Sequence, residues 1–294
     1  MNHKKNSHKT NVITLSILAV LLAAAWSMPW LAAAPSDHGN KQDDNGPVQV
    51  GYVIVTPAQA SPDITVFETF GERHGGQTLQ AGVLPSAMTT HAVLFVNTSG
   101  RLSRNVGVAI ANPGSVSAEI DLKLWDEHGE LLADYASSNA PLTVGPGEQV
   151  AKYVTEFFES HPEVSRDITG TLDIISDQPV AIIGIRARGE NFSTLPATSL
   201  SGPIPVPDLG GGIGGPGAII LAHFAEGGGW ATEIVIANAG ESDVSVRVDI
   251  FKQNSDPLEV ELNNQTNSSF IGITVPAHGV VTLAPRDQNG DSEF

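Results

Sequence analysis

The sequence contains no cysteine, and few of its residues are aromatic or basic. Without cysteine, disulfide bonds are excluded as a source of stability, and so are thiolate nucleophiles and thiolate metal ligands. Long amphipathic helical patterns are also missing, whereas the 30 glycines and 19 prolines are typical of short strands joined by turns. The sequence therefore predicts an all-β protein whose modules each depend on their own hydrophobic core, which about 100 residues can supply.

Positive charge is scarce along the whole chain. Lysine and arginine number 15 against 32 aspartates and glutamates, which gives a net charge of −17. An acidic field of this size repels phosphate groups and favours solubility. We therefore expect neither nucleic acid nor an anionic membrane surface as a partner.

The amino terminus has the layout of an export signal. Basic residues precede an uncharged apolar run from Val12 to Ala25. We predict a signal peptide over residues 1–34, followed by an acidic linker over 35–47, and a location outside the cell, either secreted or on the cell surface. An uncleaved anchor is the alternative, because the segment from Val12 to Ala34 is long enough to cross a bilayer, for which about 20 apolar residues suffice.

An internal repeat is the most informative pattern. The segment Val108–Gly114 (VAIANPG) matches Ile234–Gly240 (IVIANAG) at an offset of 126 residues. The segments that follow, Ala118–Leu124 and Val244–Ile250, both alternate apolar and polar side chains, as half-buried strands do. We predict two β-sandwich modules, over residues 91–199 and 218–294, joined by a proline- and glycine-rich linker over 200–217.

The second module lacks counterparts for the end of the first. After a predicted short helix, Val154–Glu159, the first module continues into two predicted strands, residues 170–176 and 180–187, whereas the second reaches Phe294 without them. Two segments of the same character, Gly51–Thr56 and Ile64–Phe70, precede the first module. The order predicts a circular permutation, in which residues 48–90 hold the completing strands and a connector.

A sandwich without two strands exposes backbone edges and an open core. The missing strands are supplied by the same chain, or by a neighbouring copy in strand donation that links subunits head to tail into fibres or rings. A third alternative is that the terminal pieces remain ragged or the sequence is incomplete. The predicted donor side chains are Val53, Val55, Ile64, Val66, Phe67 and Phe70.

Three phrases carry a resemblance to a known group of proteins. They are Gly82–Ser86 (GVLPS), Gly100–Pro113 (GRLSRNVGVAIANP) and Phe224–Val235 (FAEGGGWATEIV). These phrases resemble repeats of large bacterial secreted and surface proteins, which are built from tandem immunoglobulin-like or fibronectin-like sandwiches. The resemblance implies an extracellular structural or adhesive role, and it supplies no catalytic residue.

One segment has the alternating oxygen side chains of a calcium loop. Asp287, Asn289, Asp291 and Glu293 occupy alternate positions, but the glycine and the final glutamate of a full calcium loop are not in place. A solvated acidic tail is the favoured interpretation.

Other motifs for cofactors or catalysis are weak. The glycine-rich stretch 210–217 matches G-x-G-x-x-G, but prolines precede it and a predicted strand, Ala218–Phe224, follows it instead of a helix, so we interpret it as linker. The histidines are scattered, and neither a nucleophile elbow nor a Walker lysine occurs. We therefore predict that the protein is not an enzyme and has no cofactor apart from the weak calcium candidate.

Trp125 and Trp230 are the candidate surface aromatics. Exposed tryptophans in one patch favour glycan binding, whereas packing in the core or at the seam between modules is the commoner use of such side chains. The sequence as a whole predicts two immunoglobulin-like sandwiches, the second completed by permuted amino-terminal strands, in a non-catalytic extracellular protein that self-assembles by strand donation. The alternative is a monomeric adhesive module that binds a carbohydrate or a surface.

Overall fold

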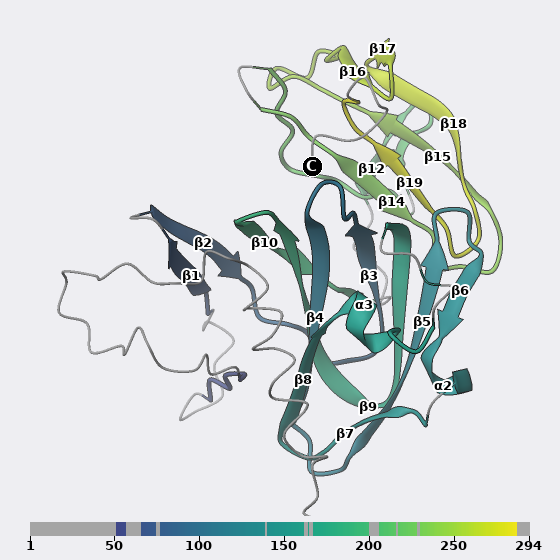
Figure 1. Cartoon of the computed structure of the whole chain (residues 1–294). Helices are drawn as coiled ribbons and strands as arrows, with labels where there is room; N and C mark the ends of the chain where they lie inside the picture. The colour runs from purple at the N-terminus through teal and green to yellow at the C-terminus, as the bar shows by residue number, and fades with distance from the viewer. Residues whose placement is uncertain are drawn as a thin grey trace, which may run out of the picture. The chain divides into compact units, whose positions relative to one another are not determined.

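The computed structural model describes residues 51–56, 66–74, 77–138, 140–161, 164, 167–199, 206–215, 217–227 and 230–286. These residues form antiparallel strands with two four-residue helices, which confirms the predicted all-β class (Figure 1). They fall into two compact units, one ending at Leu84 and the other beginning at Pro85. We describe each unit separately.

The first unit contains one hairpin. Strand β1 (Glu68–His74) pairs with β2 (Gln77–Val83), from Glu68 opposite Val83 to His74 opposite Gln77. Residues 51–56, which precede the hairpin, lie outside any strand.

In the second unit, the strands β3 to β11 form what we call the first module. Its central strand is β9 (Ile168–Arg188), which pairs along its first half with β3 (Thr89–Thr98) and β5 (Ala118–Asp126). Its second half pairs with β4 (Arg104–Asn112), whose other edge pairs with β8 (Glu148–Tyr153). The remaining elements are β6 (Leu131–Asp134), α2 (Tyr135–Ser138), β7 (Leu142–Val144), α3 (Val154–Phe157), β10 (Asn191–Pro196) and β11 (Thr198–Ser199).

Strand β9 corrects the prediction of two separate strands over 170–176 and 180–187. The Ser176 hydroxyl donates to the carbonyl of Gln178 at 2.7 Å, and the Gln178 amide donates back to the hydroxyl at 3.3 Å. This local bonding, with Pro179 behind it, bends the strand without ending it, so that β9 leaves one set of neighbours and joins the other. The residues between the two predicted strands therefore form a corner within one strand.

The two halves of β9 close over one core. Alternate side chains of the strands point into it, and the largest fully buried aliphatic ones include Leu94, Ile110, Leu122, Leu124, Leu172 and Ile174. Each such side chain contributes about 1.5–3 kcal/mol when it leaves water. Helix α3 adds Val154 and Phe157 to this core at the predicted place, although it is shorter than the predicted Val154–Glu159.

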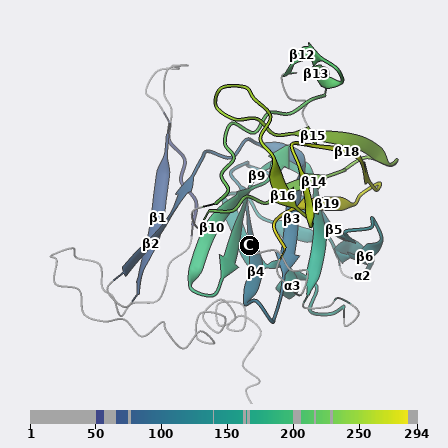
Figure 2. The same ribbon diagram turned by 90° about the horizontal axis from the view of Figure 1, so that it is seen from above.

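The strands β14 to β19 form what we call the second module (Figure 2). Within the described residues, each of these strands pairs with one other strand of the module. The pairs are β14 (Ile234–Ala237) with β19 (Val280–Leu283), β15 (Val244–Asp249) with β18 (Ser269–Val275), and β16 (Val260–Leu262) with β17 (Gln265–Asn267). A smaller core lies among them, with Ile234, Ile250, Leu262, Phe270 and Leu283 buried.

The segment between the modules differs from the prediction. Part of the predicted linker forms a hairpin, β12 (Val206–Gly210) and β13 (Ile213–Gly215), whose turn uses positive φ angles at Gly211 and Gly212. The predicted strand Ala218–Phe224 does not form. Its counterpart in the first module is β3, which pairs with β9, and the described second module has no equivalent of β9 to hold it.

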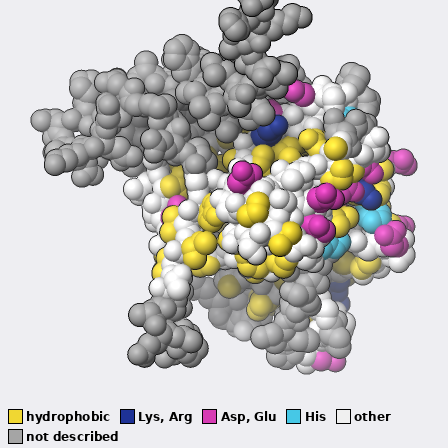
Figure 3. All heavy atoms as spheres, turned by 90° about the horizontal axis from the view of Figure 1, so that it is seen from below, with side chains coloured by type: hydrophobic (Ala, Val, Ile, Leu, Met, Phe, Trp, Pro, Cys, Tyr) yellow, Lys and Arg dark blue, Asp and Glu magenta, His cyan; other side chains and the backbone are white. Residues whose placement is uncertain are grey.

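Surface charge follows the composition. On the face drawn in Figure 3, Asp and Glu side chains are more frequent than Lys and Arg side chains. No helix among the described residues is both long and apolar enough to span a bilayer.

Candidate functional site

Two asparagines of the repeated motif make corresponding hydrogen bonds. The Asn112 side-chain amide donates to the carbonyls of Val116 (2.7 Å) and Val144 (2.9 Å), and its Oδ1 accepts from the Gly114 amide (3.0 Å). The Asn238 side chain donates to the carbonyls of Ser242, Val275 and Pro276 and accepts from the Gly240 amide. The same residue type thus ties together the same two turns in each module.

Strand registers correspond as well. In the first module Ala118 lies opposite Val144 and Ile120 opposite Leu142. In the second, Val244 lies opposite Val275 and Val246 opposite Ile273. The strands β15 and β18 therefore occupy the places that β5 and β7 occupy in the first module.

The modules differ in what covers the other edge of these strands. Strand β5 has β9 along its second edge, from Ile120 opposite Ser176 to Asp126 opposite Gly170. Within the described residues, β15 pairs with β18 alone and β14 with β19 alone. We call the unpaired side of β15 the open edge.

Burial shows the consequence of this difference. In β5 the inward side chains of Ile120, Leu122 and Leu124 are completely buried. Of their counterparts, Val246 and Val248 are only half-buried beside the edge that no described strand covers, whereas Ile250 is buried. The core of the second module is thus accessible beside the open edge.

An apolar segment near the second module is exposed in the same way. Ile219, Ile220 and Leu221 are 75%, 74% and 65% exposed, and they belong to no strand. At the 126-residue offset they correspond to Val93, Leu94 and Phe95 of β3, of which Leu94 is fully buried. Exposed runs of this kind mark interaction surfaces or aggregation liabilities.

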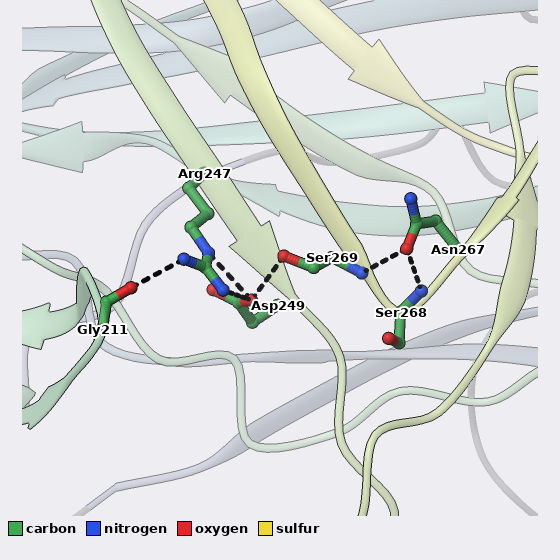
Figure 4. Close-up of polar contacts among 6 residues, drawn as sticks. All are labelled: Gly211, Arg247, Asp249, Asn267, Ser268 and Ser269. Atoms are coloured by element: carbon green, nitrogen blue, oxygen red, sulfur yellow. Dashed lines mark hydrogen bonds and ion pairs between the residues drawn. The ribbon is translucent and has the colours of Figure 1, made fainter.

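The outward face of β15 is covered by a polar cluster (Figure 4). Arg247 donates from Nη1 to the Gly211 carbonyl at 2.8 Å and from Nη2 to Asp249 Oδ1 at 2.8 Å. The Ser269 hydroxyl donates to the same Asp249 oxygen at 2.7 Å. These bonds hold the turn of the β12–β13 hairpin against the strand, and they involve side chains of the face opposite to the core.

The predicted donor side chains lie in different parts of the structure. Val53 and Val55 are 78% and 55% exposed and lie in the extended segment 51–56, which forms no strand within the chain, contrary to the predicted strand. A strand requires a partner, and the described residues offer this segment none. Ile64 lies outside the described residues, Val66 and Phe67 precede β1, and Phe70 belongs to β1, so this part of the second predicted donor strand pairs with β2.

The two candidate tryptophans have different surroundings. Trp125, at the end of β5, stacks on His278 of the second module, with ring centroids 4.2 Å apart and planes inclined by 10°. Trp230 is 72% exposed. One ring face of Trp125 is therefore covered, whereas Trp230 is accessible to solvent.

The stack belongs to a junction where turns of the two modules interlock. The Val280 amide donates to the Glu127 carbonyl at 3.1 Å. A Cβ atom on Gly129, which has a φ of +82°, would lie 1.9 Å from the Ala277 carbonyl oxygen. Only glycine permits this approach.

A largely buried ion pair completes the junction. Arg186 Nη1 lies 3.0 Å from Glu233 Oε2, and the two side chains are 17% and 5% exposed. Arg104, which is also buried, has a pKa lowered first by desolvation and then by the nearby Arg186 charge. Because removing one member of a buried pair leaves a charge uncompensated, these residues fix how the modules meet.

A polar cleft of about 540 Å³ lies at this junction. Its walls include Asn97, Arg104, Glu127, His128, Glu233 and Arg286. In the part of the chain that the structure describes, no three His, Asp or Glu side chains gather where they could bind a metal. The calcium candidates Asp287, Asn289, Asp291 and Glu293 lie outside the described residues.

Sequence reasoning did not identify the junction. No catalytic or binding motif includes His278, Glu233 or Arg186, and each is brought into contact by the packing of one module on the other. At the 126-residue offset Glu233 corresponds to Gly107 of β4, which carries no charge, so the repeat gave no indication of the ion pair.

The comparisons add little. No family model matches the chain, and no curated protein sequence matches it. Among solved structures, the Anabaena sensory rhodopsin transducer is 17% identical over an alignment that covers 33% of this chain and 95% of that one, with a TM-score of 0.27. A likeness at this TM-score carries no argument about fold or function.

Proposed function

We propose that the protein is a non-catalytic structural protein of the cell exterior, which assembles when an amino-terminal segment of one copy adds to the second module of another. The observation that carries the proposal is the open edge of β15 beside an accessible core, in a chain that also has an unpaired apolar segment at 51–56.

Two physical arguments support strand addition. An unpaired edge presents backbone N–H and C=O groups that pair readily with another strand. Each exposed valine that becomes buried contributes about 1.5 kcal/mol or more. Because donor and acceptor are different surfaces, each added copy leaves a new acceptor free, and the contact propagates head to tail.

Other observations support the repeated module and the exterior location. The corresponding bonds of Asn112 and Asn238 and the corresponding strand registers support a repeated unit. The predicted leader and the resemblance to bacterial surface repeats support export. Immunoglobulin-like modules serve structural and adhesive roles, although a fold alone does not determine function.

Glycan or surface binding is the second candidate, and the exposed Trp230 favours it. The stacked Trp125 does not add a second open platform. Trp230→Ala, compared with the unchanged protein on a glycan array, tests this candidate. Signal that disappears in the variant supports binding, and an array without signal for either protein contradicts it.

Light scattering after size exclusion tests the proposed assembly. We expect the full chain to form particles whose mass increases with protein concentration, and a chain that lacks residues 46–56 to stay at monomer mass. The deletion keeps both strands of the β1–β2 hairpin. A full chain that is monomeric at every concentration contradicts the proposal.

A further inference from the structure

The pairing of β9 with β5 provides a template for the incoming segment. We infer that Gly51–Thr56 of one copy adds antiparallel to the open edge of β15 in a second copy, with Val55 opposite Val248 and Val53 opposite Ile250. The inference rests on the proposed function and specifies the contact that the assembly uses.

The register follows from the first module. There Leu122 lies opposite Ile174 and Leu124 opposite Leu172, and all four side chains are fully buried. At the 126-residue offset, Leu122 and Leu124 correspond to Val248 and Ile250. An incoming strand therefore has to supply two apolar side chains with one residue between them.

The donor segment matches the template position by position. Residues 51–56 read GYVIVT, and residues 170–175 of β9 read GTLDII. With the two glycines aligned, Val53 takes the place of Leu172 and Val55 the place of Ile174. Val53 and Val55 are then the side chains that enter the core.

The glycine at the start is a separate argument for this alignment. A Cβ atom on Gly170 would lie 1.9 Å from the Trp125 carbonyl oxygen and 2.9 Å from Asp126 Cα. Glycine is therefore required where β9 crosses the end of β5. Gly51 provides the same residue at the matching place, opposite Lys252.

The backbone of β15 and of the two residues that follow it, Ile250 and Phe251, is arranged to accept such a strand. The Ile250 amide donates to the Ser268 carbonyl, and its carbonyl accepts from the Leu258 amide, both at 2.9 Å. Successive residues of a strand alternate the side on which they bond. The backbone groups of Asp249 and Phe251 consequently face the open edge, opposite Ile54 and Tyr52.

The occupant assigned to the open edge is a second copy of the chain. In the single chain Val53, Ile54 and Val55 are 78%, 63% and 55% exposed and belong to no strand, while β15 pairs with β18 alone. Among the described residues, the donor and the acceptor are therefore both unpaired. The contact of Arg247 with Gly211 lies on the outward face of β15 and leaves its backbone edge unpaired.

Disulfide trapping tests the register, and the absence of natural cysteine makes the test clean. Full chains carrying Val55→Cys are mixed with differently tagged full chains carrying Val248→Cys and oxidised. Val55 and Val248 would form a non-hydrogen-bonded pair, with Cα atoms about 4.5 Å apart, within the range of a disulfide. The control mixes Val53→Cys with Val248→Cys, which lies two residues out of register.

We expect at least a tenfold higher yield of the mixed covalent dimer from the first mixture than from the control. Equal yields overturn the register. Particles that form in light scattering without any mixed disulfide also overturn the register, while they leave the proposed assembly intact. The absence of both particles and mixed disulfides overturns the two together.

A chain that carries Val55→Cys and Val248→Cys together separates the two occupants. A disulfide that forms within a chain of monomer mass shows closure on the same chain and overturns the second copy as occupant. Disulfide-linked ladders of increasing mass are the expected result.

Discussion

At the scale of single residues, the buried Asn112 has the clearest structural role. It donates two hydrogen bonds and accepts one, and its side chain is completely buried. We predict that Asn112→Ala lowers the free energy of unfolding by about 3 kcal/mol, because the buried bond to the Val144 carbonyl and the partly buried bond to the Val116 carbonyl are both lost.

The matched variant is Asn238→Ala. Asn238 makes corresponding bonds but is only half-buried, so water replaces part of what is lost. A loss of about 1 kcal/mol is expected. Urea unfolding of both variants provides the comparison, and equal losses would contradict the assigned role of burial.

Gly129 tests the interlocked turns of the junction. Alanine there combines an unfavourable positive φ with a clash against Ala277, whereas Gly189 has a φ of +56° and open space around it. We predict that Gly129→Ala costs about 3 kcal/mol and Gly189→Ala about 1 kcal/mol.

Tryptophan fluorescence, to which Trp125 stacked on His278 contributes, gives a second measurement for these variants. It should change in Gly129→Ala and stay the same in Gly189→Ala. Matching stability and fluorescence for the two variants would show that the turns do not constrain one another.

The sequence alone allowed some of these residues to be identified. The repeated asparagine could be identified because its motif occurs twice in the sequence and some of its hydrogen bonds are made to nearby residues. The partners of Trp125 and Arg186 were not visible, because a contact between modules depends on how two folded surfaces meet. The sequence allowed Trp125 to be placed at a seam between the modules, but it did not identify His278 as its partner.

At the scale of elements, the segment Ala218–Leu221 is the sharpest test of the acceptor. Ile220 corresponds to the buried Leu94, and Ile219 to the half-buried Val93, yet both isoleucines are now exposed. If an added strand orders this segment as β9 orders β3, Ile220 becomes buried and Ile219 remains at the surface.

We therefore predict that Ile220→Ser weakens assembly at least tenfold, which corresponds to about 1.4 kcal/mol, while Ile219→Ser has a smaller effect. Dissociation constants from concentration-dependent light scattering measure the difference. Equal effects of the two substitutions would exclude this segment from the contact.

Elements were predicted with uneven success, for physical reasons. Alternation of apolar side chains indicated β5 and β15 correctly, since each has one face turned toward a core, buried in β5 and half-buried in β15, and one face turned toward solvent. Two strands were predicted over residues 170–176 and 180–187 where β9 is one bent strand, because the bend depends on neighbours distant in sequence. Ala218–Phe224 has the composition of a strand but does not form one, because no described strand pairs with it.

At the scale of the whole molecule, charge opposes assembly. The net charge is −17, while the donor segment Gly51–Thr56 contains no charged side chain. Salt should therefore act through repulsion between copies and leave the strand contact itself unchanged.

We predict that raising the ionic strength from about 0.01 M to about 0.15 M strengthens assembly, because the screening length falls from about 30 Å to about 8 Å. Sedimentation velocity in both buffers measures this. Assembly that weakens with salt would indicate contacts between opposite charges instead.

Amide hydrogen exchange at the open edge tests the central claim most directly. The full chain, at a concentration where particles form, is compared with the chain that lacks residues 46–56 in the same buffer. The account predicts that the amides of Asp249 and Phe251 exchange at least 100-fold more slowly in the full chain, because an added strand accepts their hydrogen bonds. Equal exchange rates at these two amides in both proteins would contradict strand addition at β15.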